Sequence, residues 1–345
     1  MKLALLVPGP FGTVSGGYIY DRRIVQGLRA LGHEVQVVEL AGRHPLPDAA
    51  AEAAARAVLA ALPADVRPVI DGLGLPAFAP LAEDLVGRGA IGLIHHPTAL
   101  EHGAPQEDRA ALRGIERDLF PRLARLVATS PHTAARLAAE FEVPAGRIGI
   151  VEPGTDPAPR AEGSGGPGTA ILAVGTLVPR KGHDVLLRTL AGLPDLDWTL
   201  TIAGGARDAV HANGLKALAE ELAITQRVTF AGEVDAEALE ALYRRADIFA
   251  LATWWEGYGM AAAEAMARGL PLAITAGGAI ADLVPMEAGA VSPPGDTVSL
   301  TKALRRMIFD REMLREMAEA SWAAGQALPR WADRASAFAA ELDRA

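Results

Sequence analysis

The chain has 345 residues, of which half are apolar and none is cysteine, and its formal net charge is -9. This length favours two domains over a single core. The negative charge argues against a general nucleic-acid binder or broad docking to an anionic membrane, and the lack of cysteine excludes disulfides, cysteine-ligated zinc and thiol nucleophiles.

The first half opens with alternating strand and helix patterns. Residues 2–7 form an apolar run that predicts a buried strand and is too short for a signal peptide, so we expect none. A glycine-rich loop at 8–17 leads into helical spacing over 18–31 and a second strand at 34–40. The loop suggests close approach of the backbone to a ligand, although its glycines do not match the dinucleotide spacing. A mobile loop stays an alternative.

A pair of histidines follows a predicted strand. After a helix at 49–62 and a strand at 69–73, residues 91–97 read as a strand ending in His95-His96-Pro97. Open α/β sheets bind ligands at the carboxyl ends of their strands. Adjacent side chains on a strand point opposite ways, so one metal held by both histidines is a poor interpretation. From the residues alone, a ligand-binding and a structural histidine are both open.

The rest of the first half ends in a linker. Residues 108–126 show helical apolar spacing broken at Pro121, which indicates an amphipathic surface helix, with membrane contact as the alternative. A helix over 131–141 and a strand over 147–151 follow. Residues 157–169 are rich in proline, glycine and alanine and predict a flexible connection between two halves.

The second half begins with a strand at 170–174, followed by Gly175 and then Arg180-Lys181-Gly182. Two adjacent cations after a strand fit a diphosphate group, and two surface cations near a turn are the alternative. The other elements predicted here are strands at 198–203, 228–234 and 272–275, and helices at 81–88 (first half), 185–190, 210–222, 236–245, 299–309, 311–321 and 331–342.

The most informative stretch is a strand, a tight turn and a helix. Residues 247–253 are apolar, the turn reads Glu256-Gly257-Tyr258-Gly259, and a helix over 261–268 follows. Backbone N–H groups at a helix start favour an anion such as phosphate. The carboxylates of Glu256 and Glu264 can accept hydrogen bonds from sugar hydroxyls. This predicts a sugar-nucleotide site, although glutamates at a helix start are also common on surfaces.

These motifs together resemble the retaining glycosyltransferases of family four, also called group 1, which have the GT-B fold. The resemblance covers Gly16-Gly17, Arg180-Lys181-Gly182, Glu256 to Glu264 and the loop at 276–282, whereas Pro153-Gly154-Thr155-Asp156 departs from the family's Asn-Gly-Val-Asp turn. It implies an α/β protein with two Rossmann-like doubly wound domains facing across a cleft. The implied parts are an acceptor-side domain (1–157), a linker (158–169), a donor domain (170–325) and a C-terminal helix packing back on the first domain (326–345).

The resemblance also implies a reaction. A hexose would move from a nucleotide-diphosphate sugar, with uridine diphosphate favoured, to a hydroxyl acceptor, with retention and without metal or other cofactor. His95, with His96 as the fallback, would contact the transferred sugar. Arg180 and Lys181 would hold the diphosphate, Glu256 the sugar hydroxyls and Glu264 the ribose hydroxyls. The other implied donor-binding residues are Gly16, Gly17, Gly175, Glu233, Val234, Gly257, Tyr258, Gly259 and Met260.

Two other functions stay open at this stage. One is another GT-B enzyme: a phosphorylase would need a Schiff-base lysine, and a sugar-nucleotide epimerase would need carboxylates in both domains, of which the first shows no clear pair. The other is a non-catalytic sugar-nucleotide binding module. The acceptor could be a membrane lipid, a small metabolite or a glycan. We expect a cytoplasmic protein, with peripheral association at the inner membrane face as one candidate.

Overall fold

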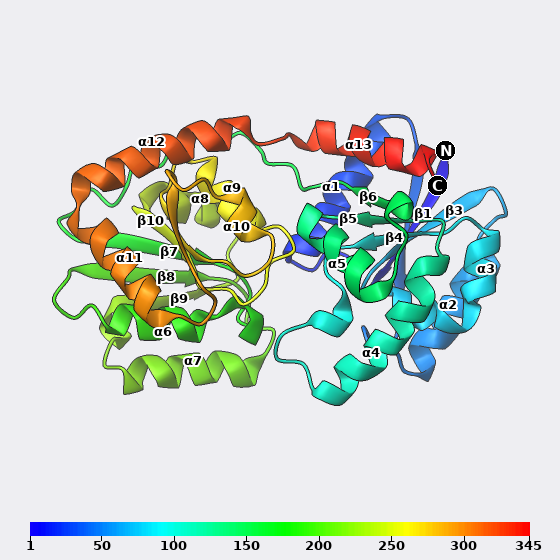
Figure 1. Cartoon of the computed structure of the whole chain (residues 1–345), viewed down its shortest axis with the longest axis horizontal. Coiled ribbons are helices and arrows are strands. Elements are labelled where there is room, and N and C mark those ends of the chain that lie inside the picture. Colours follow the sequence, from blue (N-terminus) through cyan, green and yellow to red (C-terminus); the bar gives the residue numbers. More distant parts are fainter. The chain divides into compact units, whose positions relative to one another are not determined.

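The computed structural model describes all 345 residues and divides into two compact units. Unit 1 comprises Met1–Gly154 with Pro329–Ala345, and unit 2 comprises Thr155–Leu328. Each unit has a parallel six-stranded sheet covered by helices (Figure 1). The predicted class, two doubly wound α/β domains, is therefore confirmed.

The sheet of unit 1 has the strand order β2-β1-β3-β4-β5-β6. The chain builds β2 on one side of β1 and then continues with β3 on the other side, so the order reverses between β1 and β3. Doubly wound sheets bind ligands beyond the carboxyl ends of strands at such a point. The elements are β1 (Lys2–Pro8), α1 (Gly16–Ala30), β2 (Glu34–Leu40), α2 (Ala49–Ala61), β3 (Val66–Asp71), α3 (Ala82–Gly87), β4 (Ile91–Ile94), α4 (Gln106–Leu119), β5 (Arg125–Ala128), α5 (Pro131–Phe141) and β6 (Ile148–Ile150).

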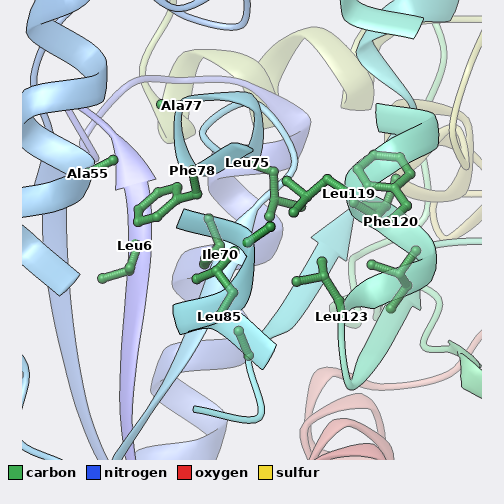
Figure 2. Close-up of a cluster of buried hydrophobic side chains, with 14 of the residues drawn as sticks. Leu6, Ala55, Ile70, Leu75, Ala77, Phe78, Leu85, Leu119, Phe120 and Leu123 are labelled. Atoms are coloured by element: carbon green, nitrogen blue, oxygen red, sulfur yellow. The ribbon is translucent and has the colours of Figure 1, made fainter. Parts of the chain in front are cut away.

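The core of unit 1 fills the space between this sheet and the helices on one face. Figure 2 shows Leu6 and Ile70 from the sheet beside Phe78 and Leu75 from the 3-10 segment η1 (Leu75–Leu81). All four side chains are fully buried. Strands covered on both faces are apolar throughout, which is why residues 3–7 of β1 show no polar alternation.

The last helix of the chain, α13 (Trp331–Asp343), belongs to unit 1 and packs along α1 (Figure 1, red and blue). Gly27 of α1 permits this contact, because a β-carbon there would lie 2.3 Å from that of Ala335. Arg125 of β5 forms a buried ion pair with Glu341 of α13. The expected return of a C-terminal helix to the first domain is confirmed.

The sheet of unit 2 has the order β12-β11-β10-β7-β8-β9, and its order reverses between β7 and β10. Helices α6, α7 and α11 bury one face, and α8 and α9 bury the other. The elements are β7 (Thr169–Val174), α6 (His183–Ala191), β8 (Trp198–Ala203), α7 (Ala209–Glu221), β9 (Val228–Gly232), α8 (Ala236–Arg245), β10 (Ile248–Leu251), α9 (Met260–Met266), β11 (Leu272–Thr275), α10 (Ile280–Leu283), β12 (Gly289–Ser292), α11 (Thr297–Phe309) and α12 (Arg311–Ala327).

Several predicted boundaries were wrong. The helix expected over 108–126 stops at Leu119, because Pro121 turns the chain into a short 3-10 segment and strand β5 begins at Arg125. The helix expected over 311–321 continues to Ala327, and it ends just before the Leu328–Pro329 step, where the residue before a proline disfavours helix. None of the helices combines the length and apolar composition needed to cross a membrane.

The stretch predicted as a linker packs on unit 2. Ala161 N–H donates to the carbonyl of Arg268, and Glu162 N–H donates to that of Arg244. The Asp247 carboxylate accepts from Ser164 N–H at 3.1 Å and from Ala170 N–H at 2.7 Å. These bonds fix the path of the chain into β7.

Candidate active site

The loops after β7 and β10 meet at the point where the strand order of unit 2 reverses. Gly182 ends the first loop with φ +61°, and a β-carbon there would lie 1.9 Å from the Ala252 carbonyl oxygen. The neighbouring backbones are joined by a 2.9 Å hydrogen bond from Trp254 N–H to the Arg180 carbonyl. Only glycine fits this close approach without strain.

This packing brings two cations and a carboxylate together. Lys181 Nζ donates to Glu256 Oε1 at 2.5 Å, and Arg180 Nη1 lies 3.7 Å from the same oxygen. Arg180 Nη1 also donates to the Trp255 carbonyl at 2.8 Å. Burial alone would raise the pKa of Glu256, but the charges of Lys181 and Arg180 hold it below its ordinary value. The site therefore has an ionised carboxylate beside two cations.

Thr253 organises this turn, and sequence reasoning did not single it out. Its Oγ1 accepts from Trp255 N–H at 3.2 Å and lies 3.0 Å from the Arg180 carbonyl and 3.3 Å from Glu256 Oε1. Thr275 Oγ1 donates to the Thr253 carbonyl at 2.6 Å. Threonine after a buried strand is common, so the sequence held no signal for this role.

A second pair of loops approaches closely beside the cations. A β-carbon at Gly204 would lie 2.0 Å from the Gly175 carbonyl oxygen, and one at Gly175 would lie 3.1 Å from Lys181 Cδ. A β-carbon at Gly205 would lie 3.0 Å from a carboxylate oxygen of Glu233, a predicted donor-binding residue after β9. Val234 follows Glu233 in the same loop.

Helix α9 carries the second predicted glutamate. The helix begins after Gly259, whose φ is +104°, with Met260 as its first residue, and Tyr258 before it is buried. Glu264 Oε2 accepts from the Tyr243 hydroxyl at 3.0 Å, while the Arg268 guanidinium stacks on the Tyr243 ring at 4.4 Å. The Tyr243 hydroxyl of α8 therefore helps to fix the position of the Glu264 carboxylate.

His183 lies buried behind the cations and should make stability depend on pH. Burial, and then the charge of Lys181, lower the pKa of His183 to about 4. The unfolded chain takes up a proton near the ordinary pKa of 6.5 and the folded chain does not, so this contribution is present above 6.5 and is lost toward pH 4. When the pH falls from 7 to 5, we expect the free energy of unfolding of the wild type to decrease by about 2 kcal/mol more than that of His183→Gln. Urea unfolding of both proteins at the two pH values measures this, and parallel losses would contradict it.

Unit 1 gathers a second group of side chains, again where its strand order reverses. His95 directly follows β4, Asp71 ends β3, and Asp21 lies in the helix after β1. His95 Nε2 lies 2.9 Å from Asp21 Oδ1 and 3.5 Å from Asp71 Oδ2. A β-carbon at Gly17 would lie 3.2 Å from His95 Cδ2. The structure therefore places two predicted residues, Gly17 and His95, side by side.

The two histidines have different partners, although both follow β4 and do not lie in the strand predicted over 91–97. His96 Nε2 lies 3.5 Å from Glu101. The turn that follows is fixed by Glu116 of α4, whose carboxylate accepts from Thr98 N–H at 2.6 Å, Thr98 Oγ1 at 2.7 Å and Ala99 N–H at 3.1 Å. Burial raises the pKa of Glu116 to about 7 against these donors.

Asp21, Asp71 and His95 bring their ligand atoms within 4.8 Å of one another, a spacing that a metal ion could also use. The 2.9 Å contact between His95 Nε2 and Asp21 is that of a direct hydrogen bond, which accounts for the arrangement without an ion. Burial, and next the charge of Asp21, raise the pKa of Asp71 to about 7. Burial pulls the pKa of His95 down, but Asp21 and Asp71 outweigh it and raise that pKa.

The sequence argument that the first domain lacks a clear carboxylate pair was wrong. Asp21 and Asp71 are far apart in the chain, and only the packing of α1 against β3 joins them. An acidic residue ending an otherwise apolar strand was the available signal for Asp71. Both residues are almost fully buried, at 1% and 2% exposure of the whole residue.

Two doubly wound units, with a cation–carboxylate site where the strand order of the second reverses, are features of the GT-B fold. Solved structures of this fold match nearly the whole chain. Sucrose-phosphate synthase from Thermosynechococcus elongatus matches with TM-score 0.82 and 20% identity over 99% of this chain and 98% of that one. Anabaena HepE in complex with UDP-glucose matches with TM-score 0.76 and 15% identity over 99% and 100% of the two chains.

Family models match both halves of the sequence. Glycosyltransferase Family 4 matches residues 14–159, and Glycosyl transferases group 1 matches residues 156–322. D-inositol 3-phosphate glycosyltransferase from Mycobacterium sp. (strain KMS) is 32% identical over 212 residues, or 56% of this chain and 48% of that protein. The enzyme of that name from Mycolicibacterium smegmatis is 30% identical over 262 residues, or 68% of this chain and 60% of that protein. The chain spans about half the length of the first of these relatives. It belongs to the group 1, family-four glycosyltransferases.

Proposed function

We propose that this protein transfers a hexose from a nucleotide-diphosphate sugar to a hydroxyl acceptor, with retention at the anomeric carbon. The observation on which this rests is the part-buried contact between Lys181 and Glu256, with Arg180 beside it, at the strand-order reversal of unit 2. Cations there fit a diphosphate, and a carboxylate fits sugar hydroxyls. A sugar diphosphate has both groups in one molecule, so its site needs the cations and the carboxylate close together.

The charges match those that develop during transfer. As the bond from the anomeric carbon to the phosphate oxygen breaks, negative charge grows on the diphosphate and positive charge grows on the sugar ring. Lys181, Arg180 and the first N–H groups of α9 stabilise the leaving diphosphate. We propose that these groups make a divalent cation unnecessary. Addition of EDTA to a turnover assay tests this, and loss of activity that magnesium restores would contradict it.

Retention is proposed through attack on the face that the diphosphate leaves. The acceptor oxygen bonds to the anomeric carbon, the carbon–oxygen bond to the phosphate breaks, and the acceptor proton moves to the departing phosphate oxygen. No side chain then needs to bond to the sugar. The anomeric configuration of the product, read by proton NMR, tests this step, because an inverted product would exclude it.

The names of similar proteins support the choice of first substrates. HepE is a neighbour in fold and its structure holds UDP-glucose, so uridine diphosphate sugars are the first donors to assay. The curated relatives are named for D-inositol 3-phosphate, so a phosphorylated cyclitol is the first acceptor, followed by extracted membrane lipids and glycans. Thermal-shift measurements with a panel of nucleotide sugars, followed by product analysis, test the function directly.

The two other functions give different results in the same assays. An epimerase would convert the donor without an acceptor, and a binding module would hold it without turnover. The buried state of Asp21 and Asp71 leaves them poorly exposed to a sugar ring, so the newly found carboxylate pair does not favour the epimerase. Transfer that depends on an added acceptor would exclude both.

Replacing Glu264 should mainly weaken donor binding. The proposed role is to accept hydrogen bonds from the ribose hydroxyls, and losing charged hydrogen bonds of this kind costs about 1.5–3 kcal/mol. We therefore expect Glu264→Ala to raise the donor Kd roughly 10- to 100-fold in a calorimetric titration. Glu220→Ala is the matched control, because Glu220 is an exposed glutamate on α7 of the same unit. Equal donor affinity in wild type and Glu264→Ala would rule out the ribose role.

A further inference from the structure

Two carboxylates from separate elements close on one nitrogen of His95. Asp21 reaches Nε2 from α1 at 2.9 Å, and Asp71 reaches it from the end of β3 at 3.5 Å. Asp71 is itself fixed, because its Oδ1 accepts from Leu73 N–H at 2.8 Å. Nε2 is thus fully engaged, and Nδ1 is the ring nitrogen left for a ligand.

The ring is also held by packing. Gly17 lies so close to the ring that a β-carbon on it would be 3.2 Å from His95 Cδ2. The rings of Tyr20 and His95 pack edge to face, with their centroids 5.1 Å apart. The Tyr20 hydroxyl donates to the Val151 carbonyl at 2.8 Å, which fixes the tyrosine in turn. His95 therefore has one orientation, set by α1 and by the two carboxylates.

The carboxylates of Asp21 and Asp71 are buried, so their negative charge needs a compensating positive charge nearby. The Asp21 side chain is 1% exposed, and that of Asp71 is 3% exposed. Asp21 Oδ2 has no hydrogen-bond partner, and Asp21 lines an apolar cavity together with residues such as Leu3, Leu28 and Phe338. A buried carboxylate is costly without a compensating charge. His95 supplies that charge, since a protonated imidazole offers Asp21 both a donor and a cation.

We propose that Asp21 and Asp71 are positioning residues that fix His95 with Nε2 protonated and hold it as an imidazolium, so that Nδ1–H is a donor for a hydroxyl of the transferred sugar. The identity of that ligand rests on the proposed function. Two acids beside one imidazolium give a cluster of zero or negative net charge. The cluster therefore offers a strong donor without placing net positive charge beside a sugar that itself becomes positive.

The other titratable groups near the His95 ring do not take over the effect of Asp21 and Asp71 on its protonation. Tyr20 is fully buried, and burial raises its pKa well above the ordinary value, so it stays neutral. The charge of Arg334 in α13 affects the pKa of Tyr20, and the Glu101 carboxylate lies beside His96. The proton on His95 should therefore respond to Asp21 first and Asp71 second.

Nitrogen-15 NMR of the imidazole rings in the full chain, titrated with pH, tests the proposal without any substrate. The protein has eight histidines, so the His95 signals are assigned by their loss in His95→Gln. We expect His95 to remain doubly protonated above the ordinary midpoint near 6.5. When it finally titrates, the proton should stay on Nε2. A signal showing proton on Nδ1 alone would overturn the assigned geometry.

Asp21→Asn keeps the shape of the side chain and an oxygen acceptor but removes the charge. We expect it to lower the His95 midpoint by about one pH unit or more, and Asp71→Asn to lower it less. Glu101→Gln is the matched control, because it removes a carboxylate beside His96 and should leave His95 unchanged. An unaltered His95 midpoint in folded Asp21→Asn, verified by circular dichroism, would overturn the proposal. So would a wild-type midpoint that moves on addition of zinc and returns with EDTA, which would identify a metal site.

Activity separates this proposal from the proposed function. If transfer occurs, Asp21→Asn should shift the pH profile of kcat/KM in the same direction as the His95 midpoint, and Asp21→Glu should restore part of it. If no nucleotide sugar is turned over or bound by the wild type, the proposed function fails while the NMR result still decides the positioning role. A pH profile unchanged in an active Asp21→Asn variant would overturn the link from these carboxylates to the ligand.

Discussion

Lys181→Ala is expected to lower turnover about 100-fold or more, because it removes the cation closest to the proposed leaving diphosphate. Lys181 Nζ lies 2.5 Å from Glu256, and Arg180 lies 3.7 Å from the same oxygen, so Arg180 replaces only part of the lost charge. Steady-state kinetics with the best nucleotide sugar found in the panel measure the loss.

The variant also leaves Glu256 buried beside one cation rather than two, so its fold needs checking by thermal denaturation. Lys181→Met keeps most of the length and packing of the side chain and separates charge from shape. Lys216→Ala, on the exposed side of α7, removes a lysine from the same unit and should leave turnover unchanged. If a folded Lys181→Ala protein turned over within twofold of the wild type, the assignment of Lys181 to the diphosphate would be wrong.

Glu341→Ala is expected to destabilise unit 1 by about 3–5 kcal/mol, because it leaves the guanidinium of Arg125 buried without its carboxylate. Arg125 is 7% exposed and Glu341 is 6% exposed. Arg125 retains only its 3.1 Å hydrogen bond to the Gly146 carbonyl. Urea unfolding monitored by fluorescence and circular dichroism measures the change.

The chain offers a matched control for that pair. Arg344 contacts the same Glu341 from solvent, with a side chain 63% exposed. Exposed ion pairs contribute roughly 0–1 kcal/mol, so Arg344→Ala should have little effect. Similar losses for Arg344→Ala and Glu341→Ala would show that burial of the Arg125 pair does not determine its strength.

The order of elements and the site of unit 2 could be predicted because their signals are local. Strands are short apolar runs, Gly182 and Gly259 mark turns, and Arg180, Lys181 and Glu256 lie in the loops that follow two of the strands. Parallel strands bring their carboxyl ends to one edge, so residues 75 apart in sequence meet without further information.

What could not be predicted depends on packing between distant elements. The partners of His95 lie in α1 and at the end of β3, and neither Asp21 nor Asp71 stands in a recognisable motif. Tyr243 positions Glu264 from the preceding helix, although its sequence context reads as an ordinary amphipathic segment. Helix ends also differ from expectation, since α12 continues past Ser321 to Ala327 through Gly325, which packs against the backbone of Met266.

The return of α13 to unit 1 makes unit 2 an insertion within unit 1. During synthesis the ribosome therefore completes residues 155–328 before it releases the helix that covers α1. Unit 2 is contiguous, whereas residues 1–154 wait for residues 329–345, with Ala335, Phe338 and Glu341 still missing from their core. Premature termination soon after residue 328 would thus damage unit 1, most of which is made before unit 2.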